Sequence, residues 1–224
     1  MKKRALVVGA TGGLGTVITK NLIEDGYTLD QKWLDDNRPD VWDKNAFLGH
    51  DEDPLDLAIY LSGINIAKPI NELTRDDIDL IFKTNVFGAF NFAQNNIERL
   101  KKGTNPTFIF ISSIMVSHPY PFRTAYASTK AAIEGLSTSL AIELGDSNIS
   151  SICLRLGHLS SLMKSTKTNP ALLSSVKSLV PQHNLIDPIE VSEFISHIHK
   201  SNSKTLNGSV IDFDGGYTKN RWPL

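Results

Sequence analysis

The sequence is poor in cysteine, in long apolar runs and in excess charge of either sign. Its single cysteine, Cys153, excludes an internal disulfide framework and a four-cysteine zinc site, and the apolar neighbours of this residue favour an inert buried thiol. No apolar run approaches the roughly 18 residues that a membrane span needs. The net charge of −1 excludes a broad electrostatic surface for nucleic acid or anionic lipid. We therefore expect no nucleic-acid partner, no membrane partner and no metal.

The chain also lacks the marks of secretion and of a multidomain protein. Its basic opening, MKKR, is followed by an apolar stretch that is too short for a secretory signal. Without that signal and without disulfides, we expect a cytoplasmic protein. The 224 residues contain no repeat and no Gly/Ser linker, and 41% of them are hydrophobic. A single domain over residues 1–224 is the expectation.

Short apolar runs alternate with segments of helical periodicity, a pattern typical of βαβ units and a parallel sheet. The predicted strands are Ala5–Val8, Leu57–Leu61, Phe108–Ile111, Ile149–Leu154 and Val210–Phe213. The predicted helices are Thr16–Asp25, Asp76–Leu100, Ala125–Leu144 and one that begins at Asp187-Pro188. Between Tyr27 and Pro54 the periodicity is weak, and we expect at most one short strand there.

Four glycines within seven residues, Gly9, Gly12, Gly13 and Gly15, connect the first predicted strand to the first helix. Glycines at this place let the backbone turn tightly and let a phosphate approach the helix N-terminus, where free N–H groups and the helix dipole favour negative charge. The plain G-x-G-x-x-G pattern does not fit, whereas G-x-x-x-G-x-G and G-x-x-G-x-x-G both do. The alternative is a tight turn without a ligand, but four glycines exceed what a turn needs.

Tyr126 is the only tyrosine followed four residues later by a lysine, Lys130. On a helix the two side chains share one face, and the ammonium stabilises the phenolate, which makes the phenol a usable acid/base. A surface Tyr–Lys pair is the alternative. Ser113 follows a predicted strand at the sheet edge where ligands bind. Asn85 lies on the apolar stripe of its helix, where it is either a structural amide or part of the catalytic machinery.

Together with the ending Asp214-Gly215-Gly216, these motifs resemble the short-chain dehydrogenase/reductase family, in its compact single-domain branch. The resemblance implies a doubly wound, Rossmann-like α/β sheet that binds NAD or NADP and an enzyme that transfers hydride between nicotinamide and a carbonyl/alcohol pair of a small molecule. It also implies that the enzyme is a homodimer or a homotetramer, because family members commonly pair through the two long helices.

The resemblance further implies roles for individual residues. Tyr126 is the general acid/base, Lys130 supports it and holds the ribose, Ser113 binds the substrate oxygen, and Asn85 fixes a water of the proton relay. The implied cofactor contacts also include Gly9, Thr11, Gly12, Gly13, Leu14 and Gly15 at the pyrophosphate, Ser62 and Gly63 beneath the adenosine, and Gly157, Leu159 and Ser161 near the nicotinamide.

The chain departs from the family at three places. Tyr60-Leu61-Ser62-Gly63 stands where Asn-Asn-Ala-Gly is usual, and Leu156-Gly157 stands where Pro-Gly is common. Only 48 residues separate Gly15 from Gly63. We therefore expect a shortening between the second and third strands, and the residue that selects NAD or NADP cannot be aligned.

Two other functions suit parts of the pattern. A sugar-nucleotide epimerase or dehydratase would share the glycines and the Tyr–Lys pair, but it needs a further substrate domain. A non-catalytic dinucleotide-binding sensor or scaffold would have no reason to keep Ser113, Tyr126 and Lys130 together. The substrate is not specified, although residues 158–185 contain no carboxylate for a cationic one.

Overall fold

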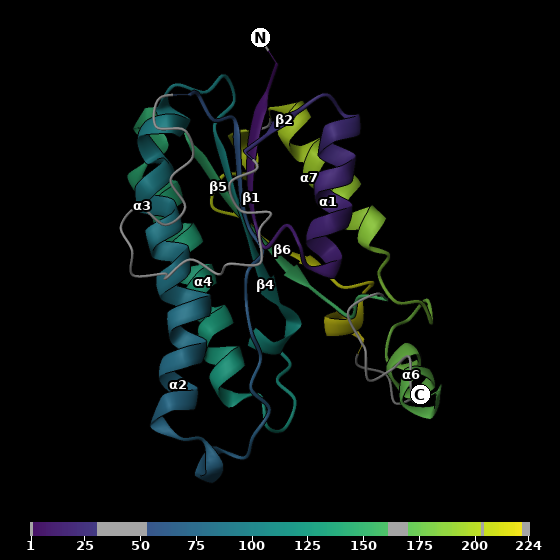
Figure 1. The fold of residues 1–224 in the computed structure, drawn as a ribbon. Coiled ribbons are helices and arrows are strands. Elements are labelled where there is room, and N and C mark those ends of the chain that lie inside the picture. Colours follow the sequence, from purple (N-terminus) through teal and green to yellow (C-terminus); the bar gives the residue numbers. More distant parts are fainter. Residues whose placement is uncertain (1, 31–52, 161–169, 203, 221–224) are drawn as a thin grey trace.

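The computed structural model describes residues 2–30, 53–160, 170–202 and 204–220. One parallel sheet of six strands forms its centre, in the order β2-β1-β3-β4-β5-β6 (Figure 1). The strands are β1 (Arg4–Val8), β2 (Thr28–Leu29), β3 (Leu57–Tyr60), β4 (Thr107–Ser113), β5 (Ser150–Leu156) and β6 (Val210–Phe213). The chain crosses over between β1 and β3, which places the carboxyl ends of both strands beside each other. At such a switch point open α/β sheets bind their ligands.

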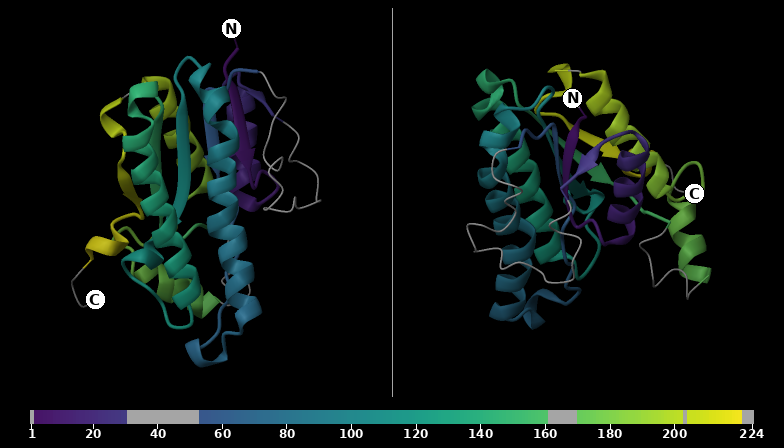
Figure 2. Two further views of the ribbon diagram at one scale, coloured as in Figure 1. Left: turned by 90° about the vertical axis from the view of Figure 1, so that its left-hand side faces the viewer. Right: turned by 45° about the horizontal axis from the view of Figure 1, so that its top comes forward.

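Helices cover both faces of the sheet, as Figures 1 and 2 show. One face carries α1 (Gly13–Glu24) and α7 (Pro188–Ser201), and the other carries α2 (Arg75–Phe82), α3 (Gly88–Lys101) and α4 (Thr124–Glu143). A further helix, α6 (Pro170–Ser178), lies beyond the carboxyl end of the sheet. Short 3-10 turns occur at Ile70–Glu72, Ile114–Val116, Gly145–Ser147, Lys204–Leu206 and Tyr217–Lys219.

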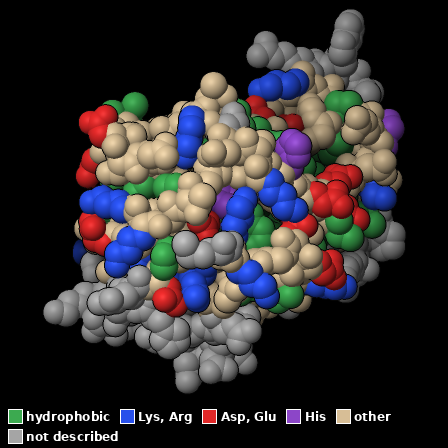
Figure 3. All heavy atoms as spheres, turned by 90° about the horizontal axis from the view of Figure 1, so that it is seen from above, with side chains coloured by type: hydrophobic (Ala, Val, Ile, Leu, Met, Phe, Trp, Pro, Cys, Tyr) green, Lys and Arg blue, Asp and Glu red, His purple; other side chains and the backbone are tan. Residues whose placement is uncertain are grey.

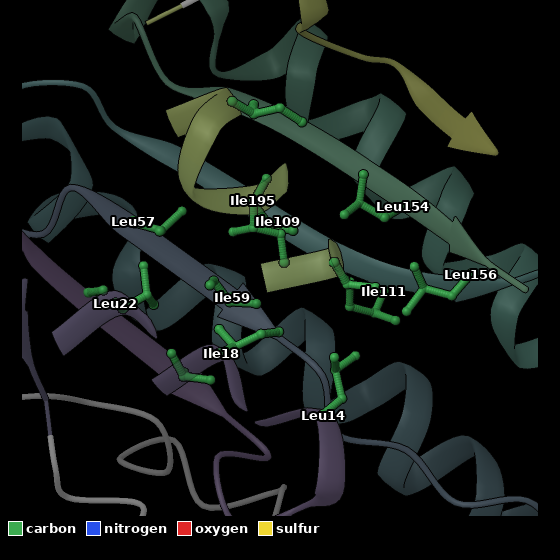
Figure 4. Packing of buried hydrophobic residues seen from close by; sticks show 14 of the residues in the cluster. Leu14, Ile18, Leu22, Leu57, Ile59, Ile109, Ile111, Leu154, Leu156 and Ile195 are labelled. Carbon is green, nitrogen blue, oxygen red and sulfur yellow. The ribbon is translucent and has the colours of Figure 1, made fainter. Parts of the chain in front are cut away.

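Each face of the sheet has its own hydrophobic core. On the α1/α7 side, Leu14, Ile18 and Leu22 of α1 pack onto aliphatic side chains of β3, β4 and β5 (Figure 4). On the other side, the fully buried rings of Phe92, Phe108 and Phe110 contact one another edge-on or stacked. Replacing such a buried phenylalanine by alanine costs about 3–5 kcal/mol, so these two cores fix the sheet against its helices.

The buried thiol and the outer surface agree with the expectations from composition. Cys153 lies in the second core, and burial raises the pKa of its thiol to about 12, which leaves it inert. Seen from above, cationic and anionic side chains are interspersed (Figure 3). Within the described ranges, no helix has both the length and the apolar character required to cross a membrane.

The structure confirms the predicted fold class, a doubly wound parallel sheet, and each predicted strand and helix is present within a few residues. Asp187 caps α7 by accepting a hydrogen bond from Ile189 N at 2.9 Å, with Pro188 in the first turn. Two features were not predicted. The segment Lys83–Phe87, between α2 and α3, is a π-helix, and α6 forms in a stretch of weak periodicity. The expected shortening between the second and third strands concerns residues 31–52, outside the described residues.

Candidate active site

A cavity of about 450 Å³ opens at the carboxyl ends of the central strands. Residues from the loops after β1, β3, β4 and β5 and from the first turns of α4 meet there. Its walls are formed by Gly9, Gly12, Gly13, Leu14, Gly15, Leu61, Gly63, Asn65, Ile111, Ser112, Ser113, Met115, Tyr120, Arg123, Tyr126, Lys130, Leu156, Gly157, His158 and Leu159. A volume of this size suits a small-molecule site.

The glycine loop forms one end of this cavity. Gly9 has φ +91°, in the left-handed region that favours glycine, and a side chain there would also meet Ser62 N at 3.0 Å. Gly15 lies on the strand side of α1, where a Cβ would stand 2.0 Å from the carbonyl oxygen of Gly9. Gly12 differs, because a Cβ there would meet only that same oxygen at 3.4 Å. Gly15 therefore permits helix–strand packing, whereas Gly12 leaves open space beside the helix N-terminus.

The Tyr–Lys pair lies on α4 and faces the cavity. Lys130 is buried and its Nζ donates a 2.8 Å hydrogen bond to the carbonyl oxygen of Ile111 at the end of β4. The same Nζ lies 5.7 Å from the centre of the Tyr126 ring. An ammonium has three N–H donors, so this anchor leaves others available for a ligand. The β4 backbone thus holds a positive charge beneath the phenol.

Asn85 is placed behind the cavity rather than on its wall. Its Oδ1 accepts a hydrogen bond from Ile64 N at 2.8 Å, and its Nδ2 donates to Ile64 O at 3.0 Å and to Thr129 Oγ1 at 2.9 Å. Thr129 in turn donates to the carbonyl oxygen of Tyr126 at 2.8 Å. The amide therefore ties the loop after β3 to the helix that carries the Tyr–Lys pair. π-helical turns often occur at functional sites, and this one presents Asn85.

Ser113 ends β4 and lines the cavity together with Tyr126 and Lys130. Its Oγ accepts a hydrogen bond from Met115 N at 3.2 Å. An acceptor role leaves the hydroxyl hydrogen free to turn towards a ligand. Ser113 is thus oriented by the 3-10 turn that follows it.

A ring network closes the other end of the cavity. Tyr120 Oη lies 2.7 Å from His158 Nε2 and 2.8 Å from Tyr217 Oη, and the rings of Tyr120 and His158 are stacked. Burial lowers the pKa of His158, which keeps its ring neutral, and it raises the pKa of Tyr120. Close packing at Gly157 supports this wall, since a Cβ there would lie 2.8 Å from the Cα of Asp214.

The cavity brings together most of the residues that the sequence predicted. On its wall are Gly9, Gly12, Gly13, Leu14, Gly15, Gly63, Ser113, Tyr126, Lys130, Gly157 and Leu159. Thr11, Ser62 and Asn85 are not part of that wall, and Ser161 lies outside the described residues. Tyr120, Arg123 and His158 line the cavity without having been predicted. Arg123 lies three residues before Tyr126, so an earlier predicted start for this helix would have placed both on one face.

Asp30, about twenty residues after the glycine loop, stands at the sequence distance at which a dinucleotide-binding carboxylate is expected. In this chain the side chain of Asp30 is buried and forms ion pairs with Arg4 and Arg99 at 3.1 and 2.5 Å. Its backbone N–H bonds to Ala5, well before the carboxyl end of β1. Asp30 is therefore a structural ion-pair residue, and cofactor preference does not follow from it.

Comparisons with known proteins agree with this geometry. The family model described as Enoyl-(Acyl carrier protein) reductase matches residues 44–218. The chain is 22% identical over 230 residues to the 3-oxoacyl-(acyl-carrier-protein) reductase MabA of Mycobacterium tuberculosis, covering 96% of this chain and 93% of MabA. It is 26% identical over 249 residues to a tropinone reductase homologue of Arabidopsis thaliana, covering 97% and 93%.

Solved structures give the same fold. ElxO with NADP bound superimposes with a TM-score of 0.82 at 21% identity, covering 98% of this chain and 100% of ElxO. A gluconate 5-dehydrogenase from Burkholderia cenocepacia in complex with NADP and tartrate gives 0.83 at 20% identity, covering 97% and 96%. The resemblance drawn from the sequence motifs is confirmed. The chain belongs to the short-chain dehydrogenase/reductase family, whose members are NAD(P)-dependent oxidoreductases.

Proposed function

We propose that this chain interconverts a carbonyl group and an alcohol of a small molecule, with Tyr126 as the proton donor or acceptor. The observation that carries the proposal is the convergence of Ser113, Tyr126 and Lys130 with the glycine loop on one cavity. A hydroxyl, a phenol and a fixed ammonium beside a phosphate-binding turn are the groups that carbonyl reduction requires.

The residues present fit a nicotinamide dinucleotide. The α1 helix begins at Gly13 without an acidic residue in its first turn and without a side-chain cap, so its first N–H groups face the cavity end unneutralised. Gly12 leaves room there, and among the residues that the structure describes no carboxylate lines the cavity. Gly12, Gly13 and Leu14 would hold the pyrophosphate, and Lys130 would hold the ribose hydroxyls. The NADP of ElxO and of the gluconate 5-dehydrogenase supports this ligand.

When bound, a reduced nicotinamide supplies hydride to the carbonyl carbon. Tyr126 donates its phenolic proton to the carbonyl oxygen, and the ammonium of Lys130 stabilises the phenolate that remains. Ser113 donates a hydrogen bond to the same oxygen while its Oγ accepts from Met115 N. Asn85 acts through structure, since its amide fixes the helix that carries Tyr126. In the oxidative direction each proton transfer is reversed.

The test is single-turnover hydride transfer with NADH and with NADPH, against a set of carbonyl compounds, for wild type and two variants. Tyr126→Phe keeps the ring, and we expect its rate to fall by about 10²–10⁴-fold while cofactor affinity in isothermal titration stays close to wild type. Lys130→Met removes both the charge beneath the phenol and the ribose ligand, so rate and cofactor affinity fall together. A Tyr126→Phe protein with wild-type turnover would refute the assignment of Tyr126, whereas the absence of hydride transfer by wild type with either cofactor would favour a non-catalytic dinucleotide sensor.

Three further properties belong to the same proposal: a single domain, a cytoplasmic location and a homodimer or homotetramer. The assembly surface is the outer side of α3 and α4, where Phe87, Phe90, Ala131 and Gly135 are exposed. A Cβ on Gly135 would meet nothing within 4 Å, which leaves room for the close approach of a second helix. Sedimentation at micromolar concentration tests the assembly, and a monomer of 24.7 kDa would contradict it.

A further inference from the structure

The charges on the cavity wall are of one sign. Lys130 and Arg123 are the only ionised side chains that line it within the described residues, and no carboxylate does so. Lys130 lies under the phenol and is anchored to Ile111 O. The guanidinium of Arg123 has no such task in the proposed reaction, although it is the strongest hydrogen-bond donor at the ring-lined end of the cavity.

Arg123 also lacks the carboxylate partner that the other described arginines have. In the described part of the chain, the four other arginines, Arg4, Arg75, Arg99 and Arg155, each form an ion pair with a carboxylate. For Arg123, the same residues offer one hydrogen bond, from Nη1 to the carbonyl oxygen of Phe122 at 3.5 Å. A guanidinium presents five N–H donors in a fork that matches a carboxylate. Most of these donors remain available to a ligand.

The position of Arg123 relative to the reacting groups sets its possible role. Arg123 caps α4, and its carbonyl oxygen accepts from Ala127 N at 2.8 Å, so Arg123, Tyr126 and Lys130 follow one another along one face of the helix. At about 1.5 Å per residue, Arg123 and Tyr126 are separated by roughly 4.5 Å along the helix axis. Lys130 lies on the opposite side of Tyr126 from Arg123. Arg123 therefore lines the cavity about one helical turn before Tyr126, on the side away from the proposed ribose contact.

The other polar groups at this end are already bonded or neutral. Tyr120 Oη contacts both His158 and Tyr217, and burial of His158 lowers its pKa and keeps the ring uncharged. Met115, Leu156 and Leu159 supply apolar wall. This end of the cavity thus offers aromatic and aliphatic surface with one available positive charge.

We propose that the substrate is an oxo acid (or the corresponding hydroxy acid), whose carboxylate binds the guanidinium of Arg123 while its carbonyl lies at Tyr126. This inference rests on the proposed function. A carboxylate one to three bonds from the carbonyl carbon suits the one-turn separation between the two side chains. Arg123 then determines specificity and orients the carbonyl, and takes no part in proton transfer.

The experiment compares 2-oxo, 3-oxo and 4-oxo acids with their methyl esters, with both reduced cofactors. We expect at least one acid to exceed its ester by about 10- to 100-fold in kcat/KM, the range of a hydrogen bond to a charged group. Arg123→Gln should remove most of that preference by raising KM for the acid. Arg123→Lys should retain part of it, because lysine offers charge without the planar fork. Arg75→Gln, a matched substitution at an exposed arginine that does not line the cavity, should behave as wild type.

A measurement without turnover accompanies the kinetics. Succinate should raise the melting temperature of wild type in a concentration-dependent way, whereas succinamide should not, and Arg123→Gln should lose the response to succinate. Equal use of acids and esters by wild type, or an unchanged acid-to-ester ratio in Arg123→Gln, would overturn the anion site and leave the proposed function intact. If no carbonyl compound is turned over, the proposed function fails, and the succinate titration alone then decides for or against the site.

Discussion

Acid should unfold this protein through a buried histidine that is remote from the cavity. His199, on α7, is fully buried between Tyr27 and the backbone before β3 and β4. Its Nε2–H donates to Asn105 O at 2.9 Å and to Asp56 O at 3.1 Å. Because both of these partners are acceptors only, Nε2 carries the hydrogen and Nδ1 accepts from Tyr27 Oη at 2.5 Å. A second proton, on Nδ1, would reverse the bond to Tyr27, because Nδ1–H would then donate to Tyr27 Oη and the phenolic hydrogen would need another acceptor.

The pKa of His199 is lowered from 6.5 to about 4, mainly by burial and also by the positive charge of Lys3. The hydrogen bonds to Asn105 and Asp56 raise the pKa and so offset part of this shift. The pKa of His199 is lower in the folded state than in the unfolded state, so acid favours unfolding. The contribution of the neutral ring to the free energy of unfolding is complete above pH 6.5 and is lost as the pH falls from 6.5 to 4. One pKa unit corresponds to about 1.4 kcal/mol, which gives a loss of about 3 kcal/mol. For a protein of ordinary stability, about 5–15 kcal/mol, this is a large fraction.

The assay is urea unfolding followed by far-ultraviolet circular dichroism, in steps from pH 7.5 to pH 4. We expect His199→Gln to be less stable than wild type at neutral pH. We also expect its free energy of unfolding to change much less with pH between pH 6.5 and 4 than that of wild type. A residual slope should remain from His158, whose pKa burial also lowers. His197→Gln, at an exposed position on the same helix, should follow wild type. A His199→Gln protein that loses as much stability as wild type across this window would refute the reasoning.

Two further predictions concern backbone conformation near the site. Gly15→Ala places a Cβ 2.0 Å from Gly9 O and should cost about 1–3 kcal/mol or more in chemical denaturation, whereas Gly12→Ala should keep the fold and weaken cofactor binding in isothermal titration. Phe122, exposed and left-handed with φ +65°, precedes Arg123. Phe122→Gly should raise the free energy of unfolding by roughly 0.5–1 kcal/mol, because glycine adopts this conformation without strain, and a lower stability would contradict that account.

The strands and most helices could be predicted because burial imposes a regular pattern on the sequence. In β4 (Thr107–Ser113), every residue except the last is buried, and its centre, Phe108–Ile111, is a continuous apolar run. Along α3 and α4, apolar residues recur at helical spacing on the sheet side. The π-turn at Lys83–Phe87 leaves no such mark, because Ile81 and Ala89 remain buried on either side of it. Asn85, within this turn, bonds through its side-chain amide to the backbone of Ile64, which belongs to a loop 21 residues earlier in the chain.

The residues of the proposed catalytic group could be singled out from the sequence for a local reason. Tyr126 and Lys130 are one helical turn apart, Ser113 ends a recognisable strand, and the four glycines fall within seven residues, so each motif lies within a short stretch of sequence. The residues of the ring network do not fall within one short stretch of sequence. Tyr120, His158 and Tyr217 come from three separate segments, and only the packing of the loops after β4, β5 and β6 brings them together.

Arg123 shows that the tertiary structure decides whether a charged side chain is available to bind a ligand. In the sequence Arg123 does not differ from Arg99, which is buried against Asp30, or from Arg155, which binds Glu134 and Asp212 through separate nitrogen atoms. Those ion pairs join residues that are 21 to 69 positions apart, so no local sequence pattern predicts them. Only after the fold has paired these carboxylates with other arginines is Arg123, among the arginines that the structure describes, left on the cavity wall with most of its donors available. A substrate carboxylate would give Arg123 the kind of ion pair that the other described arginines form within the protein.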